Sequence, residues 1–239
     1  MRVLVTRPEP GASQTAERLE ALGHTAIAMP LSRTEPLMAG VNAAACPGSG
    51  DFVVTSAAAI RAVSDRASHD IVIWAVGKAT ADQARNAGFR NVMDGPGDGA
   101  GLSAMLVARR DQSNGPLTYL AGRVRSPVFE RALMAAGVNF RTIDVYDTID
   151  IDYGPDEIDA LRSGRIDAVL LYSRRAAERF AEIAARHPAA GFDAAMIACL
   201  SENVAAGLPT AMRLKALWSR TPCEPALLEL LSSNRNQGG

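Results

Sequence analysis

Hydrophobic residues along the chain form short continuous runs that alternate with longer amphipathic stretches. Runs such as 52–55 and 168–171, rich in Val and Leu, predict buried β-strands. The stretch 174–186 places apolar residues three and four positions apart, which predicts a helix with one buried face. Because strands and helices alternate throughout, the expected fold class is α/β, with parallel sheets that helices cover on both faces.

The predicted elements account for most of the sequence. Strands are expected at 2–5, 25–29, 52–55, 71–76, 91–93, 117–120, 168–171, 196–199 and 214–218. Helices are expected at 11–22, 57–66, 79–87, 102–109, 127–136, 156–162, 174–186, 202–208 and 224–231. We expect an irregular segment at 40–50 with at most one helical turn, loops at 94–101 and 112–115, and a disordered tail at 234–239.

Two long extended segments flank the middle of the chain. Residues 141–151 alternate β-branched or aromatic residues with polar ones and contain neither Gly nor Pro. Residues 25–36 are the upstream counterpart, and each segment follows a helix that stops at a glycine, Gly23 or Gly137. We interpret the pair as a two-stranded β bridge that carries the backbone from one lobe to another and back.

An internal repeat supports this interpretation. Pairing Gly23 with Gly137 aligns residues 2–34 with 116–148. A second block then aligns residues 52–80 with 169–203, with gaps. If residues 2–34 are called block A and 52–80 block B, then 116–148 is A′ and 169–203 is B′. The chain therefore has the order A-B-A′-B′.

Two assemblies fit this block order. Each half of the chain could fold by itself, or A could pair with B′ while B pairs with A′. The bridging segments favour the second assembly, since each lies at a junction between an A and a B block. It predicts one lobe from residues 1–34 plus 152–239 and another from residues 35–151.

Composition and charge narrow the class of protein. The chain has 239 residues, of which 48% are hydrophobic and 21% charged, and its formal net charge is -1. These values indicate a globular protein with a core of ordinary size, and the absence of a basic excess argues against nucleic-acid binding. The apolar run at 3–5 is too short for a signal peptide or a membrane span, so we expect a cytoplasmic protein without a membrane partner. A monomer is expected, because no segment is apolar all round.

The metal-ligating residue types are scattered. Cys46, Cys199 and Cys223 show no spacing typical of zinc sites or of disulfide frameworks, so each is expected to be reduced and to serve packing. The three histidines also stand singly. We therefore expect no metal site.

Several motifs, in this order along the chain, resemble those of uroporphyrinogen-III synthases. The most specific is Val-Tyr-Asp-Thr at 145–148. The others are Val-Leu-Val-Thr-Arg-Pro at 3–8, Val-Val-Thr-Ser at 53–56, Trp-Ala-Val-Gly-Lys-Ala-Thr-Ala at 74–81, Ala-Gly-Phe at 87–89 and the Gly122 loop ahead of Leu133 and Gly137. Each motif is weak by itself, but their order and spacing together cover nearly the whole chain.

The resemblance implies a fold and an activity. It implies two doubly wound, flavodoxin-like α/β lobes joined by a two-stranded ladder, with the crosswise connectivity favoured above. It also implies an enzyme that takes hydroxymethylbilane, a linear tetrapyrrole with eight carboxylates, and closes it to uroporphyrinogen III in haem biosynthesis. The reaction removes the terminal hydroxyl as water and inverts the last pyrrole ring, and the family uses no metal or organic cofactor.

Candidate binding residues lie where strands give way to helices. In open α/β sheets ligands gather at the carboxyl ends of the strands, and unpaired amides at helix N-termini favour anions. If both lobes turn these edges toward one cleft, a polycarboxylate could be held mainly by backbone amides and hydroxyls. The candidate substrate-binding residues are Arg7, Thr55, Ser56, Ala57, Gly77, Lys78, Thr80, Gly122, Arg123, Ser173, Arg174 and Ser201.

These residues also have simpler explanations. The hydroxyl residues among them stand where any helix favours an N-cap. The arginines and the lysine are types that usually lie on a solvated surface.

Tyr146 is the candidate catalytic residue. A phenol has a pKa of about 10, so at neutral pH it donates a proton rather than accepting one. It could assist the loss of the hydroxyl, which the pyrrole nitrogen already promotes. Asp144 or Asp147 could stabilise the azafulvene cation that results, although either could simply be solvated. The alternative for Tyr146 is packing, the usual role of an aromatic residue on a strand.

Two departures from the family pattern stand out. Where the last lobe of the family often carries Gly-Pro-Thr-Thr-Ala, this chain has Leu-Ser-Glu-Asn-Val at 200–204, so Ser201 or Asn203 is at most a substitute for a threonine. An arginine that the family commonly places after the Gly122 loop is displaced, and Arg125 is only near the expected place.

Other functions fit less well. A two-lobed extracellular receptor would need an export signal. A nucleotide-dependent enzyme would need Gly-x-Gly-x-x-Gly or a Walker motif, and the glycine cluster at 97–101 matches neither. A receiver-like regulator would need acidic residues where Thr6, Thr55 and Gly77 stand. The remaining alternative is a cytoplasmic two-lobed protein that binds small anions without catalysis.

Overall fold

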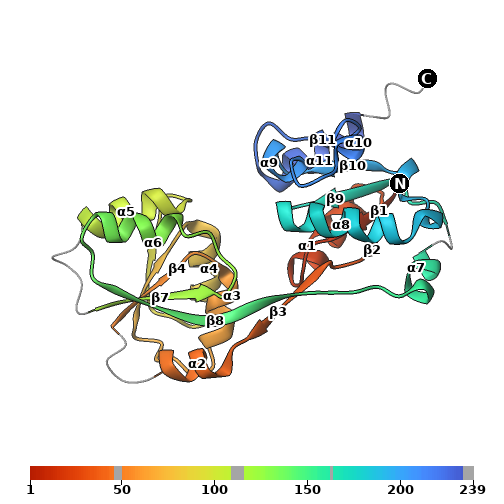
Figure 1. Ribbon diagram of the computed structural model, residues 1–239. Helices are drawn as coiled ribbons and strands as arrows, with labels where there is room; N and C mark the ends of the chain where they lie inside the picture. Colours follow the sequence, from red (N-terminus) through yellow and green to blue (C-terminus); the bar gives the residue numbers. More distant parts are fainter. Residues whose placement is uncertain (46–49, 109–115, 162–163, 234–239) are drawn as a thin grey trace. The chain divides into compact units, whose positions relative to one another are not determined.

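The structure is a computed structural model that describes residues 1–45, 50–108, 116–161 and 164–233. Contacts between Cα atoms divide the chain into two compact units. The terminal unit comprises Met1–Arg33 and Asp150–Gly239, and the middle unit comprises Thr34–Ile149. Each unit is built around one sheet (Figure 1).

The terminal unit has a five-stranded sheet in the order β11-β10-β9-β1-β2, and its strand pairs are parallel. The strands are β1 (Arg2–Val5), β2 (Thr25–Ala28), β9 (Ala168–Leu171), β10 (Met196–Cys199) and β11 (Leu217–Trp218). The helices are α1 (Gly11–Ala21), α7 (Pro155–Leu161), α8 (Arg174–Arg186), α9 (Glu202–Ala205), α10 (Thr210–Arg213) and α11 (Glu224–Ser233), with short 3₁₀ turns at Pro188–Ala190 and Phe192–Ala194.

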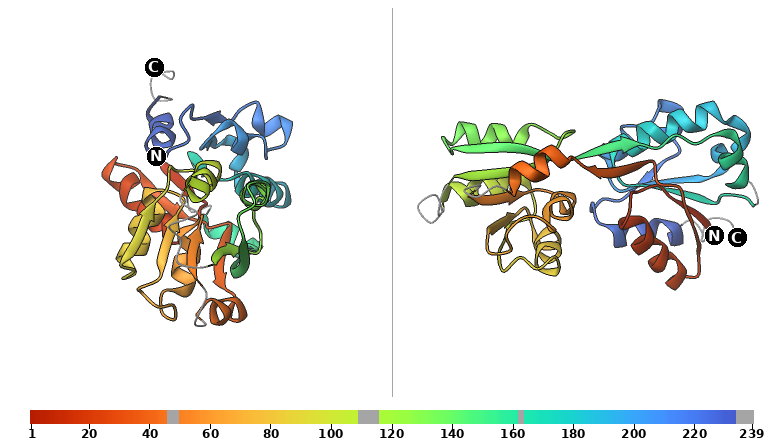
Figure 2. Two further views of the ribbon diagram at one scale, coloured as in Figure 1. Left: turned by 90° about the vertical axis from the view of Figure 1, so that its left-hand side faces the viewer. Right: turned by 90° about the horizontal axis from the view of Figure 1, so that it is seen from below.

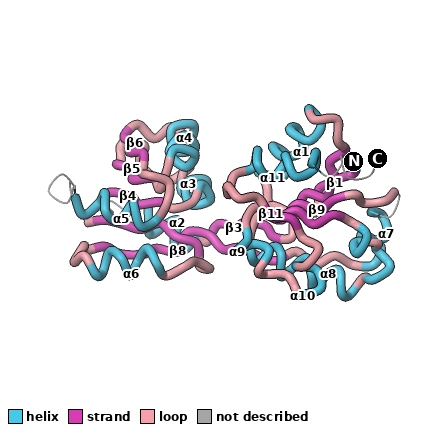
Figure 3. Tube along the Cα trace, turned by 90° about the horizontal axis from the view of Figure 1, so that it is seen from above, coloured by secondary structure: helices cyan, strands magenta, loops and turns pink. Residues whose placement is uncertain are grey.

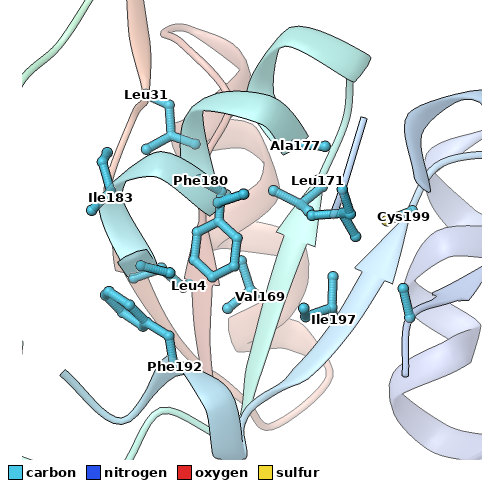
Figure 4. Close-up of a cluster of buried hydrophobic side chains, with 14 of the residues drawn as sticks. Leu4, Leu31, Val169, Leu171, Ala177, Phe180, Ile183, Phe192, Ile197 and Cys199 are labelled. Carbon is cyan, nitrogen blue, oxygen red and sulfur yellow. The ribbon is translucent and has the colours of Figure 1, made fainter. Parts of the chain in front are cut away.

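Successive side chains of the buried strands point to opposite faces, which gives this unit two apolar layers. Leu4 and Val169 pack on the face covered by α7, α8 and α9, whereas Val3 and Leu170 pack against α1 and α11. Figure 3 shows α1 and α11 on one side of the sheet and α8 on the other. Phe180 of α8 fills the middle of the first layer (Figure 4), edge to face with Phe192.

The middle unit has a six-stranded sheet in the order β3-β8-β7-β4-β5-β6, parallel from β8 to β6. The strands are β3 (Ser32–Pro36), β4 (Asp51–Val54), β5 (Val72–Ala75), β6 (Asn91–Asp94), β7 (Leu117–Gly122) and β8 (Phe140–Asp150). The helices are α2 (Met38–Ala44), α3 (Ala57–Val63), α4 (Lys78–Asn86), α5 (Gly99–Ala108) and α6 (Val128–Ala135). Helices α2, α3 and α4 pack with Phe52 and Val54 on one face, and α5 and α6 pack with Val53 and Tyr119 on the other.

Each sheet combines strands from distant parts of the chain. In the terminal unit β2-β1-β9-β10-β11 takes two strands from the first block and three from the last. In the middle unit β8-β7-β4-β5-β6 repeats the same spatial order with the two inner blocks. The two units therefore have the same spatial order of strands, which is that of a flavodoxin-like sheet. They differ in the order in which the chain passes through these strands.

The extended segment predicted at 25–36 is not continuous. It splits into β2 and β3, which belong to different sheets. Met29 and Leu31 donate their amides to the consecutive carbonyls of Val5 and Thr6, so Pro30 is an extra residue opposite β1 and the regular pairing of β2 ends there. The counterpart at 141–151 does form one strand, β8, and β3 is its neighbour (Figure 2).

Three other predictions differ from the structure. The segment expected at 40–50 to be irregular with at most one helical turn is helical up to Ala44, because helix α2 already starts at Met38 and buries Val41 and Ala44. Helix α5 begins at Gly99 instead of 102, because Asp98 accepts the Gly101 amide at 2.8 Å and so initiates the helix inside the glycine cluster. The strand expected at 214–218 shortens to β11, since α10 precedes it and leaves Leu214 exposed.

Some predictions fall outside the described residues: the turn at 112–115, the tail at 234–239 and the packing of Cys46. Within the described part of the chain, no helix is long and apolar enough to span a membrane.

Gly40 allows α2 to approach the backbone of β8. A Cβ at this position would stand 1.9 Å from the carbonyl oxygen of Asp144. We expect Gly40→Ala to lower the free energy of unfolding by about 1–3 kcal/mol, because the helix must move away from the strand. Denaturant unfolding would measure this cost, with the exposed Ala43→Ser on the same helix as a control that stays within about 0.5 kcal/mol. An unchanged Gly40→Ala would contradict the close approach.

Candidate active site

In the middle unit the turns after β4 and β5 form two helix starts at the carboxyl edge of the sheet. Ser56 caps α3 by accepting the amide of Ala58 at 3.2 Å. Gly77 occupies the cap of α4 and has no side chain to offer. The first amides of each helix have no partner inside it, so both turns present N–H groups at this edge.

The glycine cluster after β6 packs against the second of these turns. A Cβ on Gly77 would stand 2.9 Å from the Cα of Gly97, and a Cβ on Gly95 would stand 2.4 Å from the Ala75 carbonyl oxygen. The glycines therefore permit one loop to lie directly on another. This packing explains a cluster that lacks the spacing of a nucleotide-binding loop.

Lys78 and Thr80 of α4 lie in different environments. The Lys78 side chain is 79% exposed and pairs with Asp82 at 2.9 Å on the same helix. Thr80 is buried in the first turn, where its amide bonds to the Gly77 carbonyl. The side chain of Lys78 thus points to solvent, whereas Thr80 supports the turn from inside.

Tyr146 lies beside the end of β7. It pairs with Gly122 across a register shift in the ladder between β7 and β8, and its carbonyl accepts the Arg123 amide at 2.9 Å. A Cβ on Gly122 would stand 2.6 Å from two carbons of the Tyr146 ring, so the ring rests on the bare backbone of that glycine. Tyr146 is half-buried and packs against the apolar layer beneath it.

Thr55 contacts a second tyrosine at the same edge. Its hydroxyl lies 2.9 Å from the hydroxyl of Tyr119, which is buried and packs edge to face on Phe129. Burial raises the pKa of Tyr119, so this phenol stays neutral. No pattern in the sequence indicates this pair, because Tyr119 looks like an ordinary aromatic residue of a strand.

Arg125 holds the loop after β7 in place. Its guanidinium donates to the Gly122 carbonyl at 2.8 Å, to Asp144 at 2.7 Å and to Glu130 at 3.1 Å. Thr142 also donates to Glu130. This arginine therefore connects the loop, helix α6 and strand β8, and it fixes the position of Gly122 beneath Tyr146.

The two candidate cation-stabilising carboxylates both have partners. Asp144 pairs with Arg125, and Asp147, which is buried, pairs with Arg123 at 2.9 Å. Their charges are therefore largely compensated by adjacent guanidiniums.

In the terminal unit the serines again cap helices. Ser173 accepts the amide of Ala176 at 3.1 Å at the start of α8, and Ser201 accepts that of Val204 at 3.4 Å at the start of α9. Arg174 pairs with Glu178 one turn further along α8. These bonds confirm the capping interpretation, and they leave the earlier amides of both helices facing the carboxyl edge.

Arg7, at the end of β1, belongs to a polar cluster that sequence reasoning did not find. Its guanidinium lies 4.5 Å from the centre of the Tyr172 ring and pairs with Glu224 of α11 at 3.3 Å. Thr15 and Arg18 of α1 also bond to Glu224. Glu224 stands 217 residues from Arg7 in sequence, so no local pattern could connect the two.

The strand registers correct one alignment of the internal repeat. Val54 pairs with Ala75 in one unit, and its counterpart Leu171 pairs with Cys199 in the other. The two turns therefore correspond with a shift of one residue, which matches the caps Gly77 and Ser201. The counterpart of Thr80 then becomes Val204, which is buried and apolar. With this register no hydroxyl stands at the position that corresponds to Thr80.

Cys199 and Cys223 are the free cysteines in the described part of the chain. No group of three His, Cys, Asp or Glu side chains could hold a metal ion there. Burial raises the pKa of the Cys199 thiol to about 12, so this group stays protonated and unreactive. Cys223 is exposed.

Arg125 forms ion pairs with Glu130 and Asp144, which we call the clamp. From these pairs we expect part of the stability of the fold to depend on pH. Arg125 lowers the pKa of Glu130, so the stabilisation is complete above the unfolded-state pKa of about 4.3 and is lost as the pH falls through the lowered folded-state pKa. We expect Glu130→Gln to reduce the free energy of unfolding by about 1–2 kcal/mol at pH 7, and by less below about pH 4. Denaturant titrations at both pH values measure this. Asp70→Asn, which breaks the exposed pair with Arg90, is the control, and an equal loss at both pH values would refute the clamp.

Comparisons with known proteins agree with this architecture. Two similar solved structures are a uroporphyrinogen-III synthetase from Helicobacter pylori and a mutant uroporphyrinogen III synthase from Thermus thermophilus. The first has a TM-score of 0.65 and 15% identity, with 98% of this chain and 100% of that chain covered. The second has a TM-score of 0.57 and 19% identity, with 99% of each chain covered. These likenesses show the fold.

No curated protein matches the sequence. The family model for Uroporphyrinogen-III synthase HemD matches residues 13–228, which is most of the chain. The chain therefore belongs to the uroporphyrinogen-III synthase family, whose members cyclise hydroxymethylbilane to uroporphyrinogen III in haem biosynthesis.

Proposed function

We propose that this synthase holds the carboxylates of hydroxymethylbilane at the carboxyl edges of its parallel sheets, and that Tyr146 donates the proton with which the terminal hydroxyl leaves as water. Most of the binding comes from backbone amides and capping hydroxyls. The residues proposed to contact substrate are Arg7, Thr55, Ser56, Ala57, Gly77, Lys78, Thr80, Gly122, Arg123, Ser173, Arg174 and Ser201.

The helix starts support carboxylate binding at these edges. In the middle unit α3 and α4 begin at Ser56 and Gly77, and in the terminal unit α8 begins at Ser173. The positive end of each helix dipole and the unpaired first amides favour an anion. Since the formal net charge of the chain is only -1, such local features supply the attraction that a basic surface would otherwise provide.

The position of Tyr146 supports its role as proton donor. Its half-buried ring rests on Gly122 at the edge where β7 ends, so the phenol is fixed by backbone and not by a flexible loop. The carbon–oxygen bond of the hydroxymethyl group breaks as the pyrrole nitrogen donates electrons into the ring. The departing oxygen takes the phenolic proton and leaves as water.

Positioning then decides which ring carbon is attacked. The unassisted reaction closes without inverting the last ring, so the enzyme must hold the azafulvene cation, formed on the pyrrole that lost its hydroxyl, close to the already substituted carbon of the last pyrrole at the other end of the molecule. Asp144 and Asp147 are paired with arginines, which makes them weak candidates for stabilising the cation directly. We propose that the shape of the binding surface contributes more than any single side chain.

We also propose that the protein acts as a monomer and binds no nucleic acid. The nearly neutral charge of the chain supports the second of these statements.

Tyr146→Phe removes the phenolic hydroxyl and keeps the ring on Gly122. We expect about a tenfold loss of kcat, less than the hundredfold or more that a dominant general acid contributes, with uroporphyrinogen III still the main product. The assay supplies enzymatically generated hydroxymethylbilane and resolves the oxidised porphyrin isomers. Tyr153→Phe, which removes a hydroxyl that bonds to the Pro30 carbonyl, is the control and should keep kcat. A loss of about 10⁴-fold with the fold intact would show that acid catalysis and not positioning dominates.

Gly122→Ala tests positioning. The new methyl group must displace the Tyr146 ring, since a Cβ there stands 2.6 Å from ring carbons. We expect the fraction of uroporphyrinogen III among the products to fall in favour of the isomer without ring inversion, because the surface that holds the substrate changes shape. Thermal unfolding separates this effect from a loss of fold. An unchanged isomer ratio in a folded variant would refute the role of this contact.

A further inference from the structure

Glu224 gathers donors from three separate parts of the terminal unit. It lies at the first position of α11, and its side chain is 12% exposed. Arg7 after β1, Thr15 and Arg18 on α1, and Tyr172 after β9 all donate to its carboxylate. One carboxylate therefore connects the ends of two adjacent strands with two helices.

Arg7 is confined on several sides by this arrangement. A Cβ on Gly11 would stand 2.3 Å from the Arg7 Nε, so only a glycine leaves room for the guanidinium against the start of α1. The ring of Tyr172 lies on another side, 4.5 Å from the guanidinium carbon. Glu224 bonds to Nη1, and 30% of the Arg7 side chain remains exposed. The arginine is thus held in one orientation while part of it still faces solvent.

The charges of the cluster leave it cationic. Arg7 and Arg18 carry two positive charges that no pH near neutrality removes, and Glu224 compensates one of them. Burial raises the pKa of Tyr172, so its phenol stays neutral and adds a donor without adding charge. The remaining positive charge lies at the end of β1, at the edge to which the carboxylates of the substrate are assigned.

We infer that Glu224 is a positioning residue, which orients Arg7 over Tyr172 so that the exposed part of the guanidinium receives one carboxylate of hydroxymethylbilane. This inference rests on the proposed function, in which Arg7 contacts substrate. Arginine loses much rotamer freedom when it binds an anion, and a side chain that is already fixed has less to lose. Glu224 therefore acts on substrate affinity through Arg7, without touching the substrate.

The middle unit shows that this cluster is not a general feature of the fold. Val5 pairs with Leu170 in one sheet, and Tyr119 pairs with Val53, the counterpart of Leu170, in the other. The same correspondence places Ala121 opposite Arg7. The same offset along α1 and α6 places Phe129 at the position of Thr15, and Phe129 is an apolar residue that packs edge to face on Tyr119. An oriented arginine at this position thus belongs to the terminal unit and would recognise one particular carboxylate.

The test is a double-mutant cycle in the full-length protein with Arg7→Ala, Glu224→Gln and the two combined. KM and kcat for hydroxymethylbilane are measured together with the melting temperature. We expect Arg7→Ala to raise KM about tenfold or more and Glu224→Gln to raise it about threefold to tenfold, with kcat unchanged. The double variant should have the KM of Arg7→Ala alone, because Glu224 has nothing left to orient. Glu182→Gln, which removes an exposed carboxylate paired with Arg179 on α8, is the control.

Each other outcome has a definite meaning. If Glu224→Gln raises KM by the same factor whether or not Arg7 is present, Glu224 acts independently of Arg7 and the inference is wrong. If Arg7→Ala raises KM and Glu224→Gln does not, the inference is wrong but the proposed contact of Arg7 with substrate stands. If Arg7→Ala leaves KM unchanged, the proposed contact itself is wrong.

A conservative variant covers the case in which Glu224→Gln does not fold. Glu224→Asp keeps the charge and withdraws the carboxylate by one methylene group. We expect it to raise KM less than Gln does, and only when Arg7 is present. A folded Glu224→Asp with the KM of the wild type would overturn the inference.

Discussion

The pairing of β8 with β7 is the interaction on which the middle unit depends. It adds a strand to the parallel sheet, and its register shift at Gly122 brings Tyr146 over a residue without a side chain. The neighbouring groups follow from it. Asp144 and Thr142 on β8 anchor Arg125 and Glu130, and the close approach of Gly40 fixes the same strand from α2. The site of Tyr146 is therefore determined by the backbone first and by side chains second.

Hydrophobic runs predicted the fold well because burial of a strand on both faces leaves a clear trace in sequence. The runs at 168–171 and 196–199 coincide with β9 and β10, and the amphipathic stretch at 174–186 coincides with α8. Edges were harder. At Pro30 an extra residue ends the regular pairing with β1 and separates two strands, and near Leu214 a helical turn takes residues that composition alone would give to a strand.

Sequence predicted the candidate site only where a contact joins residues that are close together in the chain. A serine after a strand indicates a cap from sequence, and Ser56, Ser173 and Ser201 are caps. The contact of Gly122 with the Tyr146 ring depends on a bulge in the ladder, and the bond of Thr55 to Tyr119 depends on strand pairing. Glu224 reaches Arg7 only through the packing of α11 against the sheet. Such contacts arise from tertiary structure and have no signature along the chain.

The order in which the chain forms the strands of the two sheets also affects how the protein folds during synthesis. On the ribosome, β1 and β2 emerge before the middle unit but must wait for β9, β10 and β11 before their sheet can close, whereas the strands from β4 to β8 emerge one after another. The middle unit has all its partners once residue 150 is available. The strands β1 and β2 thus belong to a unit that is completed after the middle unit, and until then the apolar side chains of β1 have no sheet to pack in and are available to chaperones.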